Sequence, residues 1–356
     1  MNEASLTRHY SPSRTVKVGT VVIGGDAPVT VQTMWKTPLA GTNPQEIITG
    51  IQRLQKAGCA LLRFAVPSLE EARLLIELQK RSPLPLVADV HFDHRIALAC
   101  ITGGIPKIRI NPGNIGGADK AGEVIRAAKE FGVALRIGVN AGSLPRLLRN
   151  DKNTVKAMLM AAEEERNILE RYGFYDAVFS FKSSDVETTI RVNRLFRERY
   201  DYPLHLGVTE AGPLIPGIVR NTAALYTLLT EGIGETLRVS LSSDPLDEVA
   251  TGREILKTSG RPVGGVTVIS CPTCGRSSFP VRDFYERVKQ ELDSIEKEVT
   301  VAIMGCPVNG PGEARHADLG ITGAGKQAVI FKKGKVLRRE LIENAFEAFV
   351  KELRNL

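Results

Sequence analysis

Short apolar runs alternate with longer amphipathic stretches through most of the chain. The runs suit buried strands, and the stretches between them repeat apolar residues at helical spacing. This alternation predicts a parallel sheet in which a helix follows each strand. Strands are expected at 29–34, 60–66, 85–90, 106–111, 133–139, 176–182, 203–209 and 236–241. Helices are expected at 44–57, 68–81, 93–103, 117–131, 143–172, 184–199, 217–232 and 246–258.

Eight strand–helix units in succession are more typical of a TIM (β/α)8 barrel than of an open sheet. A further strand is expected at 16–23, joined to the first barrel strand by a Gly-Gly-Asp turn. Near residue 261 the sequence Arg-Pro-Val-Gly-Gly has the composition of a linker. The predicted fold class is therefore α/β, with a TIM barrel over 1–260 and a small α+β domain over 261–356.

The small domain contains two segments in which cysteine follows a predicted strand. The strands are expected at 266–270 and 299–304, so the two cysteine loops should lie side by side at one edge of a small sheet. The other expected elements are a helix at 281–297, a hairpin with a Lys-Gly turn at 327–337 and a helix at 339–354.

Composition and charge narrow the possible functions. The chain is 43% hydrophobic and 24% charged, which is ordinary for a globular protein, and its net charge is +7. The N-terminus is polar and no apolar run is long enough for a membrane span, so a cytoplasmic protein is expected. No basic patch interleaved with aromatic residues is present, so the positive charge favours an anionic small molecule over nucleic acid. The segment Gly323-Ala-Gly-Lys326 lacks the spacing of a Walker A loop.

Charged and hydrogen-bonding residues gather where the predicted barrel strands end. These carboxyl ends form the mouth of a TIM barrel, where the active site lies. A single arginine in such a place is most often a surface or ion-paired residue, but five cations on different strands would repel one another unless an anion lay between them. We therefore predict a phosphate or diphosphate site. The cations are Arg63, Arg109, Arg136, Lys182 and Arg238, and the accompanying polar residues are Asp89, His91, Asn111, Asn140, Glu210 and Ser240.

Three cysteines and a glutamate near the C-terminus have the spacing C-x2-C-x31-C-x6-E. A structural zinc site is the simplest alternative, but such sites usually have four Cys or His ligands, and no histidine stands in the fourth position. Three thiolates with one weaker ligand favour a [4Fe-4S] cluster that has one exchangeable iron. Cys59 and Cys100 lie among apolar residues and are expected in the core.

Six motifs are specific enough to indicate a family: RINPGNIG (109–116), RIGVNAGS (136–143), VTEAG (208–212), LRVSL (237–241), CPTC (271–274) and CPVNGPGEA (306–314). Over nearly its whole length the chain resembles the two-domain bacterial members of the IspG/GcpE family, the 4-hydroxy-3-methylbut-2-en-1-yl diphosphate synthases. The resemblance implies reductive ring opening and dehydration of 2-C-methyl-D-erythritol 2,4-cyclodiphosphate. The product would be (E)-4-hydroxy-3-methylbut-2-enyl diphosphate, in the non-mevalonate (MEP) route to isoprenoids.

The resemblance also implies a role for each candidate residue. Cys271, Cys274 and Cys306 would hold a [4Fe-4S] cluster that delivers two electrons one at a time, and Glu313 would be the displaceable ligand of the fourth iron. Glu210 would donate a proton to the hydroxyl that leaves as water. The expected substrate contacts are Arg63, Asp89, Arg109, Asn111, Arg136, Asn140, Lys182, Arg238, Ser240 and Asn309.

The implied partners are a flavodoxin or ferredoxin as electron donor and a second copy of the chain. In such a homodimer, the barrel of one subunit and the cluster domain of the other form each site. The chain departs from the family after the first barrel strand, where it reads TMWKTPLAG in place of a Ser-Met followed by Thr- and Asp-rich residues. No substrate contact is therefore assigned to Trp35 or Lys36.

Two alternatives explain only part of the pattern. A pterin-synthase-like barrel enzyme with a structural zinc module would also bind a diphosphate at its mouth, but it does not account for three cysteines with a glutamate. A nucleic-acid-binding protein with a zinc module and a basic face would not require cations at successive strand ends. Both are weaker interpretations than the reductase.

Overall fold

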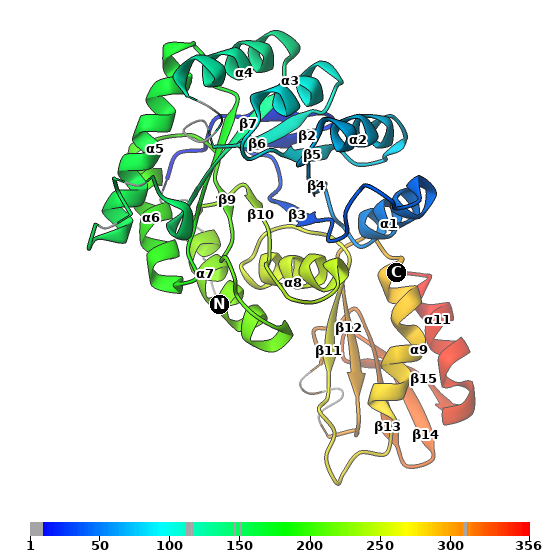
Figure 1. Cartoon of the computed structure of the whole chain (residues 1–356). Coiled ribbons are helices and arrows are strands. Elements are labelled where there is room, and N and C mark those ends of the chain that lie inside the picture. The colour runs from blue at the N-terminus through cyan, green and yellow to red at the C-terminus, as the bar shows by residue number, and fades with distance from the viewer. Residues whose placement is uncertain are drawn as a thin grey trace. The chain divides into compact units, whose positions relative to one another are not determined.

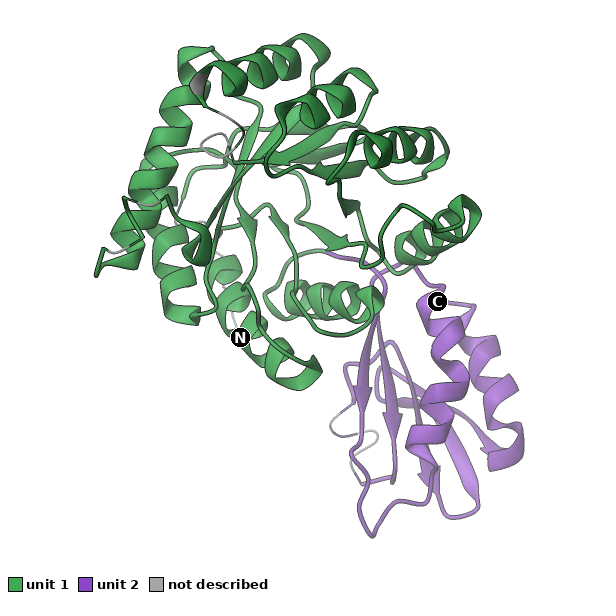
Figure 2. Cartoon of the chain, in the orientation of Figure 1, with its two compact units in different colours: residues 1–262 green, residues 263–356 purple. Residues whose placement is uncertain are grey.

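The computed structural model describes residues 10–111, 115, 117–145, 147–149, 151–308, 312 and 314–356. The chain divides into two compact units, the first ending at Pro262 and the second running from Val263 to Leu356 (Figure 2).

The first unit is a barrel of parallel strands, as predicted. Neighbouring strands pair in the order β8-β7-β6-β5-β4-β3-β10-β9, and every pair is parallel. A parallel bridge between Phe179 of β8 and Leu204, the residue before β9, nearly closes the ring. The strands are β3 (Thr30–Met34), β4 (Leu61–Ala65), β5 (Leu86–Asp89), β6 (Lys107–Ile110), β7 (Ala134–Asn140), β8 (Ala177–Lys182), β9 (His205–Leu206) and β10 (Thr236–Leu237).

A ring of helices surrounds the barrel (Figure 1). Several of them begin at a polar residue whose side chain accepts a hydrogen bond from the first turn, for example Ser68 from the amide of Glu71 and Asp185 from that of Thr188. These caps fix where each strand-to-helix loop ends, and so they position the residues at the barrel mouth. The helices are α1 (Pro44–Lys56), α2 (Leu69–Arg81), α3 (His94–Thr102), α4 (Ala118–Phe131), α5 (Thr154–Arg171), α6 (Val186–Arg199), α7 (Leu214–Thr230) and α8 (Pro245–Thr258).

An N-terminal hairpin closes the end of the barrel at which the strands begin. Its strands are β1 (Val16–Val18) and β2 (Val21–Ile23), which pair antiparallel. Their apolar side chains form a buried cluster with residues at or near the start of four barrel strands, namely Leu61, Val87, Ala134 and Val178. The prediction of one strand over 16–23 is wrong because Gly19, at φ +57°, reverses the chain there.

The second unit is a five-stranded sheet with helices α9 (Val281–Asp293) and α11 (Ala345–Leu353) against one face. The core on that face includes Phe284 and Phe349 from the helices and Ile303 from the sheet. The strand order is β11 (Val266–Ser270), β12 (Val299–Met304), β13 (Leu319–Ala324), β14 (Gln327–Lys332) and β15 (Lys335–Leu341). The first three strands pair in parallel, β14 pairs antiparallel with β13, and β15 pairs antiparallel with β14.

Some predicted boundaries are wrong, and each has a local cause. The helix expected over 143–172 begins at Thr154, because Asn153 caps it and a separate 3-10 turn (Ala141–Ser143) precedes Pro145. The strands expected at 203–209 and 236–241 are two residues long. In the second unit, β13 was not predicted, since its sequence LGITGA is glycine-rich.

At the C-terminus, the helix expected from 339 begins at Ala345, because β15 extends to Leu341. The helix expected over 281–297 ends at Asp293. The predicted hairpin with a Lys-Gly turn is confirmed, with φ +48° at Lys333 and +75° at Gly334. No described helix combines the length and the apolar character that a membrane span requires.

Candidate active site

The barrel mouth brings together charged residues from successive strands. The register places Asp89 beside Arg109, Arg109 beside Arg136, and Asn140 beside Lys182. Two glycines make room for the long side chains. A Cβ at Gly138 would lie 3.0 Å from the guanidinium of Arg109, and one at Gly207 would lie 2.8 Å from Nζ of Lys182. Arg63, Asp89, Arg109, Arg136 and Lys182 are all less than 10% exposed.

Asp89 is the carboxylate that organises this group. Its Oδ1 accepts a hydrogen bond from Nη1 of Arg109 at 3.1 Å, and its Oδ2 lies 3.6 Å from Nε of Arg63. Nε2 of His91 lies 3.4 Å from Oδ1. Burial opposes ionisation of Asp89, but the contact with His91 and the charges of Arg63 and Arg109 outweigh it and hold its pKa well below the usual range. Asp89 is therefore ionised and fixes the two arginines.

The remaining cations exceed what this carboxylate can neutralise. Arg136 donates from Nη2 to Oγ of Ser180 at 3.0 Å, while its Nε and Nη1 have no partner among the described residues. Burial, together with repulsion from neighbouring arginines, lowers the pKa of Arg136 and of Lys182. Burial also lowers the pKa of Arg63 to about 10. Buried donors without partners and mutually repelling charges are the features of a site that receives an anion.

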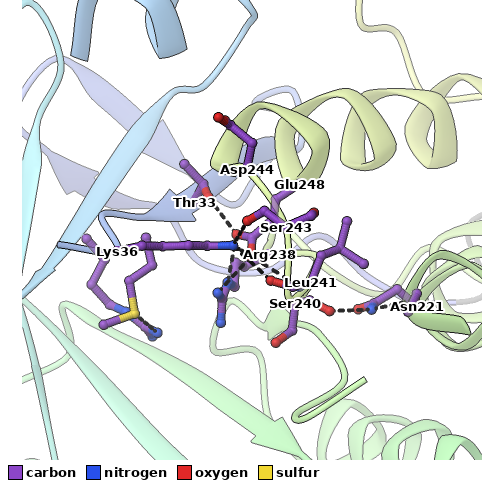
Figure 3. Close-up of polar contacts among 12 residues, drawn as sticks. Thr33, Lys36, Asn221, Arg238, Ser240, Leu241, Ser243, Asp244 and Glu248 are labelled. Carbon is purple, nitrogen blue, oxygen red and sulfur yellow. Dashed lines mark hydrogen bonds and ion pairs between the residues drawn. The ribbon is translucent and has the colours of Figure 1, made fainter. Parts of the chain in front are cut away.

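Arg238, directly after β10, is held by a buried carboxylate of α8 (Figure 3). Its Nε and Nη2 donate to the two oxygens of Glu248 at 3.1 and 3.0 Å. Glu248 is 0% exposed and also accepts from Oγ1 of Thr33 at 2.6 Å. The next predicted contact, Ser240, lies at the same end of the barrel, where its backbone carbonyl accepts from Nδ2 of Asn221 at 3.4 Å.

The segment after β3 supplies one wall of a cavity of about 660 Å³ that Arg238 also lines. Trp35 stacks on Phe64 with ring centroids 5.7 Å apart. Lys36 extends to Glu248, with Nζ 3.1 Å from Oε1. Lys36 therefore brings an additional cation to the Arg238 side of the mouth.

The other predicted site residues differ in how the structure presents them. Asn111 follows β6 and is half-buried, and Asn140 ends β7 with an Oδ1 that has no partner in the described part of the chain. Glu210 is exposed in the loop between β9 and α7, at φ +51°, a left-handed backbone that is uncommon outside glycine and often marks a functional position. Asn309 and Glu313 lie outside the described residues. The ligand roles of all these residues stay predictions.

A deeper polar layer was not predicted from the sequence. Lys107, His205 and Gln32 are 0% exposed, and each has side-chain nitrogen atoms without a partner among the described residues. Burial, then the charges of Arg136 and Arg63, lowers the pKa of Lys107 to about 7. Burial and the neighbouring cations likewise lower the pKa of His205. Strand alternation could have identified Lys107, because it lies two residues before Arg109 and therefore on the same face of the strand.

In the second unit the two cysteine loops lie side by side, as predicted. Cys271 follows β11, and its amide donates to the carbonyl of Ile303 at 3.0 Å; the amide of Ser278 donates to Gly305 at 2.8 Å. The amide of Thr273, a residue at φ +63°, points at Sγ of Cys271 at 3.4 Å. A hydrogen bond from the amide of Arg276 lowers the pKa of Cys274.

Amides directed at sulfur stabilise thiolates, which are the form that binds metal. Cys306 is 5% exposed in the adjoining loop. Burial raises the pKa of Cys59 and Cys100 to about 12, so these two remain core thiols, as predicted. Within the described ranges, which leave out Glu313, no three Cys, His, Asp or Glu side chains are grouped as a metal site. The four-ligand set stays a prediction.

This combination defines a class: a (β/α)8-barrel with a cationic mouth, joined to a small α+β domain that carries three cysteines. The GcpE TIM-barrel domain matches residues 13–253, and the GcpE protein C-terminal domain matches residues 267–355. The chain belongs to the GcpE family.

Relatives match over nearly the full length. The protein of Treponema denticola is 44% identical over all of both chains, and that of Clostridium acetobutylicum is 45% identical over 97% of this chain and 99% of its own. The protein of Treponema pallidum is 48% identical over 89% of this chain and 81% of its own. All three are named 4-hydroxy-3-methylbut-2-en-1-yl diphosphate synthase (flavodoxin).

Solved structures confirm the barrel fold. A dihydropteroate synthetase with bound product covers 69% of this chain and 100% of its own, with a TM-score of 0.53 and 14% identity. The Yersinia pestis dihydropteroate synthase covers 69% of this chain and 97% of its own, with a TM-score of 0.50 and 14% identity. At such low identity the likeness shows the fold alone. The pterin-synthase-like alternative is not favoured, since both family matches and the full-length relatives indicate the GcpE family.

Replacing Lys107 with methionine should stabilise the protein, and more so at low pH. Folding lowers the pKa of Lys107 from 10.5 to about 7, so between these values the unfolded chain binds the proton that the folded chain releases. The free energy of unfolding then rises with pH between these two values. The cost of burying the charged ammonium is largest at pH values below them. Urea unfolding in phosphate-free buffer should show that Lys107→Met increases the free energy of unfolding by roughly 2–3 kcal/mol more at pH 6 than at pH 9.

The exposed Lys17 provides a matched control, since Lys17→Met should change stability little at either pH. A Lys107→Met variant that is destabilised equally at both values would show that Lys107 is paired in the folded protein.

Proposed function

We propose that this chain is a 4-hydroxy-3-methylbut-2-en-1-yl diphosphate synthase. It takes 2-C-methyl-D-erythritol 2,4-cyclodiphosphate, two electrons and two protons, and it releases (E)-4-hydroxy-3-methylbut-2-enyl diphosphate and water. The observation that carries this proposal is the set of buried cations at the barrel mouth, which outnumber the carboxylates bonded to them. The shared name of the full-length relatives supports the same activity.

The barrel mouth would bind and orient the cyclodiphosphate. Arginine forks match pairs of phosphate oxygens, and Arg136 has two nitrogens free of partners in the described chain. Asp89 keeps Arg63 and Arg109 in place before the substrate arrives, so little side-chain freedom is lost on binding. The diphosphate would in turn relieve the repulsion that lowers the pKa of Lys182.

Glu210 would supply the proton for the hydroxyl that leaves as water. It follows β9 at the mouth, and the next residue, Ala211, is tied by a hydrogen bond from Nη1 of Arg220 to its carbonyl at 2.8 Å. A carboxyl group within reach of the leaving hydroxyl can act as its general acid.

A [4Fe-4S] cluster would be held by Cys271, Cys274 and Cys306, with Glu313 as the exchangeable ligand. When bound, such a cluster supplies single electrons and a Lewis-acidic iron. The amides of Thr273 and Arg276 would stabilise the thiolates, and burial of Cys306 would keep water from its sulfur. The relatives' names contain the word flavodoxin, which supports a flavodoxin as electron donor, with ferredoxin as the alternative.

Protein purified without oxygen should contain about four irons per chain and show broad visible absorption that dithionite bleaches. It should convert the cyclodiphosphate when a reduced flavodoxin is supplied. Cys306→Ser should lose iron and activity together, whereas Cys100→Ser, which alters a core thiol, should keep both. One colourless zinc per chain in the wild-type protein would refute the proposed chemistry.

We also propose that each active site combines the barrel of one subunit with the cluster domain of another, as the family resemblance implies. Arg136→Met and Cys306→Ser should each be inactive alone, because one lacks a substrate contact and the other a cluster ligand. Mixed and reassociated, they should recover up to about a quarter of wild-type activity per chain if the sites are shared between subunits. No recovery, with mixed dimers demonstrated by affinity tags, would show that each chain forms its own site.

A further inference from the structure

The ammonium group of Lys36 contacts three groups of the protein. Its Nζ lies 3.1 Å from Oε1 of Glu248, donates to the carbonyl of Leu241 at 2.8 Å and donates to that of Ser243 (Figure 3). The ammonium thus makes two hydrogen bonds and one ion pair, all of them within the protein. Lys36 therefore acts on the protein around it and not directly on a ligand.

Glu248 lies between two cations. Besides Lys36 it bonds Nε and Nη2 of Arg238, and it accepts from Thr33 and from the amide of Leu241 at 3.1 Å. Alone, Arg238 and Glu248 would form a neutral pair with little attraction for a distant anion. With Lys36 present, the group carries one net positive charge. Because Glu248 is 0% exposed and the side chain of Arg238 is 16% exposed, solvent screens the attraction between these two residues weakly.

The geometry leaves one face of Arg238 directed away from the carboxylate. A guanidinium that bonds a carboxylate through Nε and Nη2 points Nη1 to the opposite side. Lys36 also joins the segment after β3 to the loop Leu241–Ser243, and residues of both segments line the cavity of about 660 Å³ beside Arg238. The side chain of Lys36 thus sets the net charge of this part of the mouth and also holds together the two segments that line it.

We propose that Lys36 is a positioning residue for the diphosphate: it neutralises Glu248, so that the positive charge of Arg238 is available to the substrate. This inference rests on the anion site of the proposed function. It assigns a role to a residue for which neither the family pattern nor the sequence indicated one.

A double-mutant cycle tests the inference, with inorganic diphosphate as the probe and the cluster-loaded protein as the sample. Lys36→Met should weaken diphosphate binding and raise KM for the cyclodiphosphate, each about tenfold, with kcat within about twofold, because it removes a charge that acts on binding. Lys36→Arg should remain within about threefold of wild type. The double variant Lys36→Met/Glu248→Gln should recover most of the lost affinity, since the charge that Lys36 neutralises is then absent.

Lys80→Met is the matched control, because Lys80 also pairs with a carboxylate, that of Glu77 at 2.6 Å, but on the exposed surface of α2. It should leave every value unchanged. If Lys36→Met does not fold, Lys36→Gln, with and without Glu248→Gln, replaces it in the cycle, because glutamine still donates to the two loop carbonyls.

The outcomes separate this inference from the proposed function. Wild-type protein that does not bind diphosphate would refute the anion site itself. If wild type binds diphosphate and Lys36→Met binds it equally well, Lys36 has a structural role alone and the inference is wrong. If the double variant is as weak as Lys36→Met, Lys36 attracts the anion by its own charge, which also overturns the inference.

Discussion

The site depends on one constraint: several cations are buried in one barrel without enough carboxylates to neutralise them. Asp89 pairs with Arg63 and Arg109, and Glu248 pairs with Arg238. Among the described residues, Arg136, Lys182 and Lys107 remain, and burial, together with repulsion from neighbouring cations, lowers their pKa values. A charge cluster of this kind costs stability in the free protein, and an anion relieves it on binding. The diphosphate of the proposed substrate would be such an anion.

The barrel tolerates this cluster because its two ends differ in chemistry. At the end where the strands begin, the hairpin of β1 and β2 packs valine and isoleucine against Leu61, Val87, Ala134 and Val178. That apolar layer supplies stability, so the opposite ends of the same strands can carry charge. The glycines at 138 and 207 then let long cationic side chains cross the neighbouring strands. In the four strands that meet the hairpin, the apolar layer and the charged residues thus lie at opposite ends.

Most of the site could be predicted because strand ends in a (β/α)8 barrel are close in space although far apart in sequence. Lys182 and Arg238 could be assigned to one mouth without any knowledge of contacts. The ion pairs that these residues form could not be predicted. Nothing in the sequence shows that Glu248 bonds Arg238, since that contact depends on how α8 packs. Lys107 was missed because a lysine early in a strand is usually exposed. The lengths of β9 and β10 were overestimated, because the strand propensity of a residue does not show where the hydrogen bonding between strands ends.

Proton uptake on binding tests the central claim most directly. Titration calorimetry of the protein with inorganic diphosphate, in buffers of different ionisation enthalpy near neutral pH, measures how many protons accompany the anion. If buried cations await an anion, their pKa values rise on binding and the protein takes up protons from the buffer. The account predicts measurable uptake that is reduced in Lys107→Met. Net proton exchange that is the same in wild type and Lys107→Met, or no binding, would contradict it.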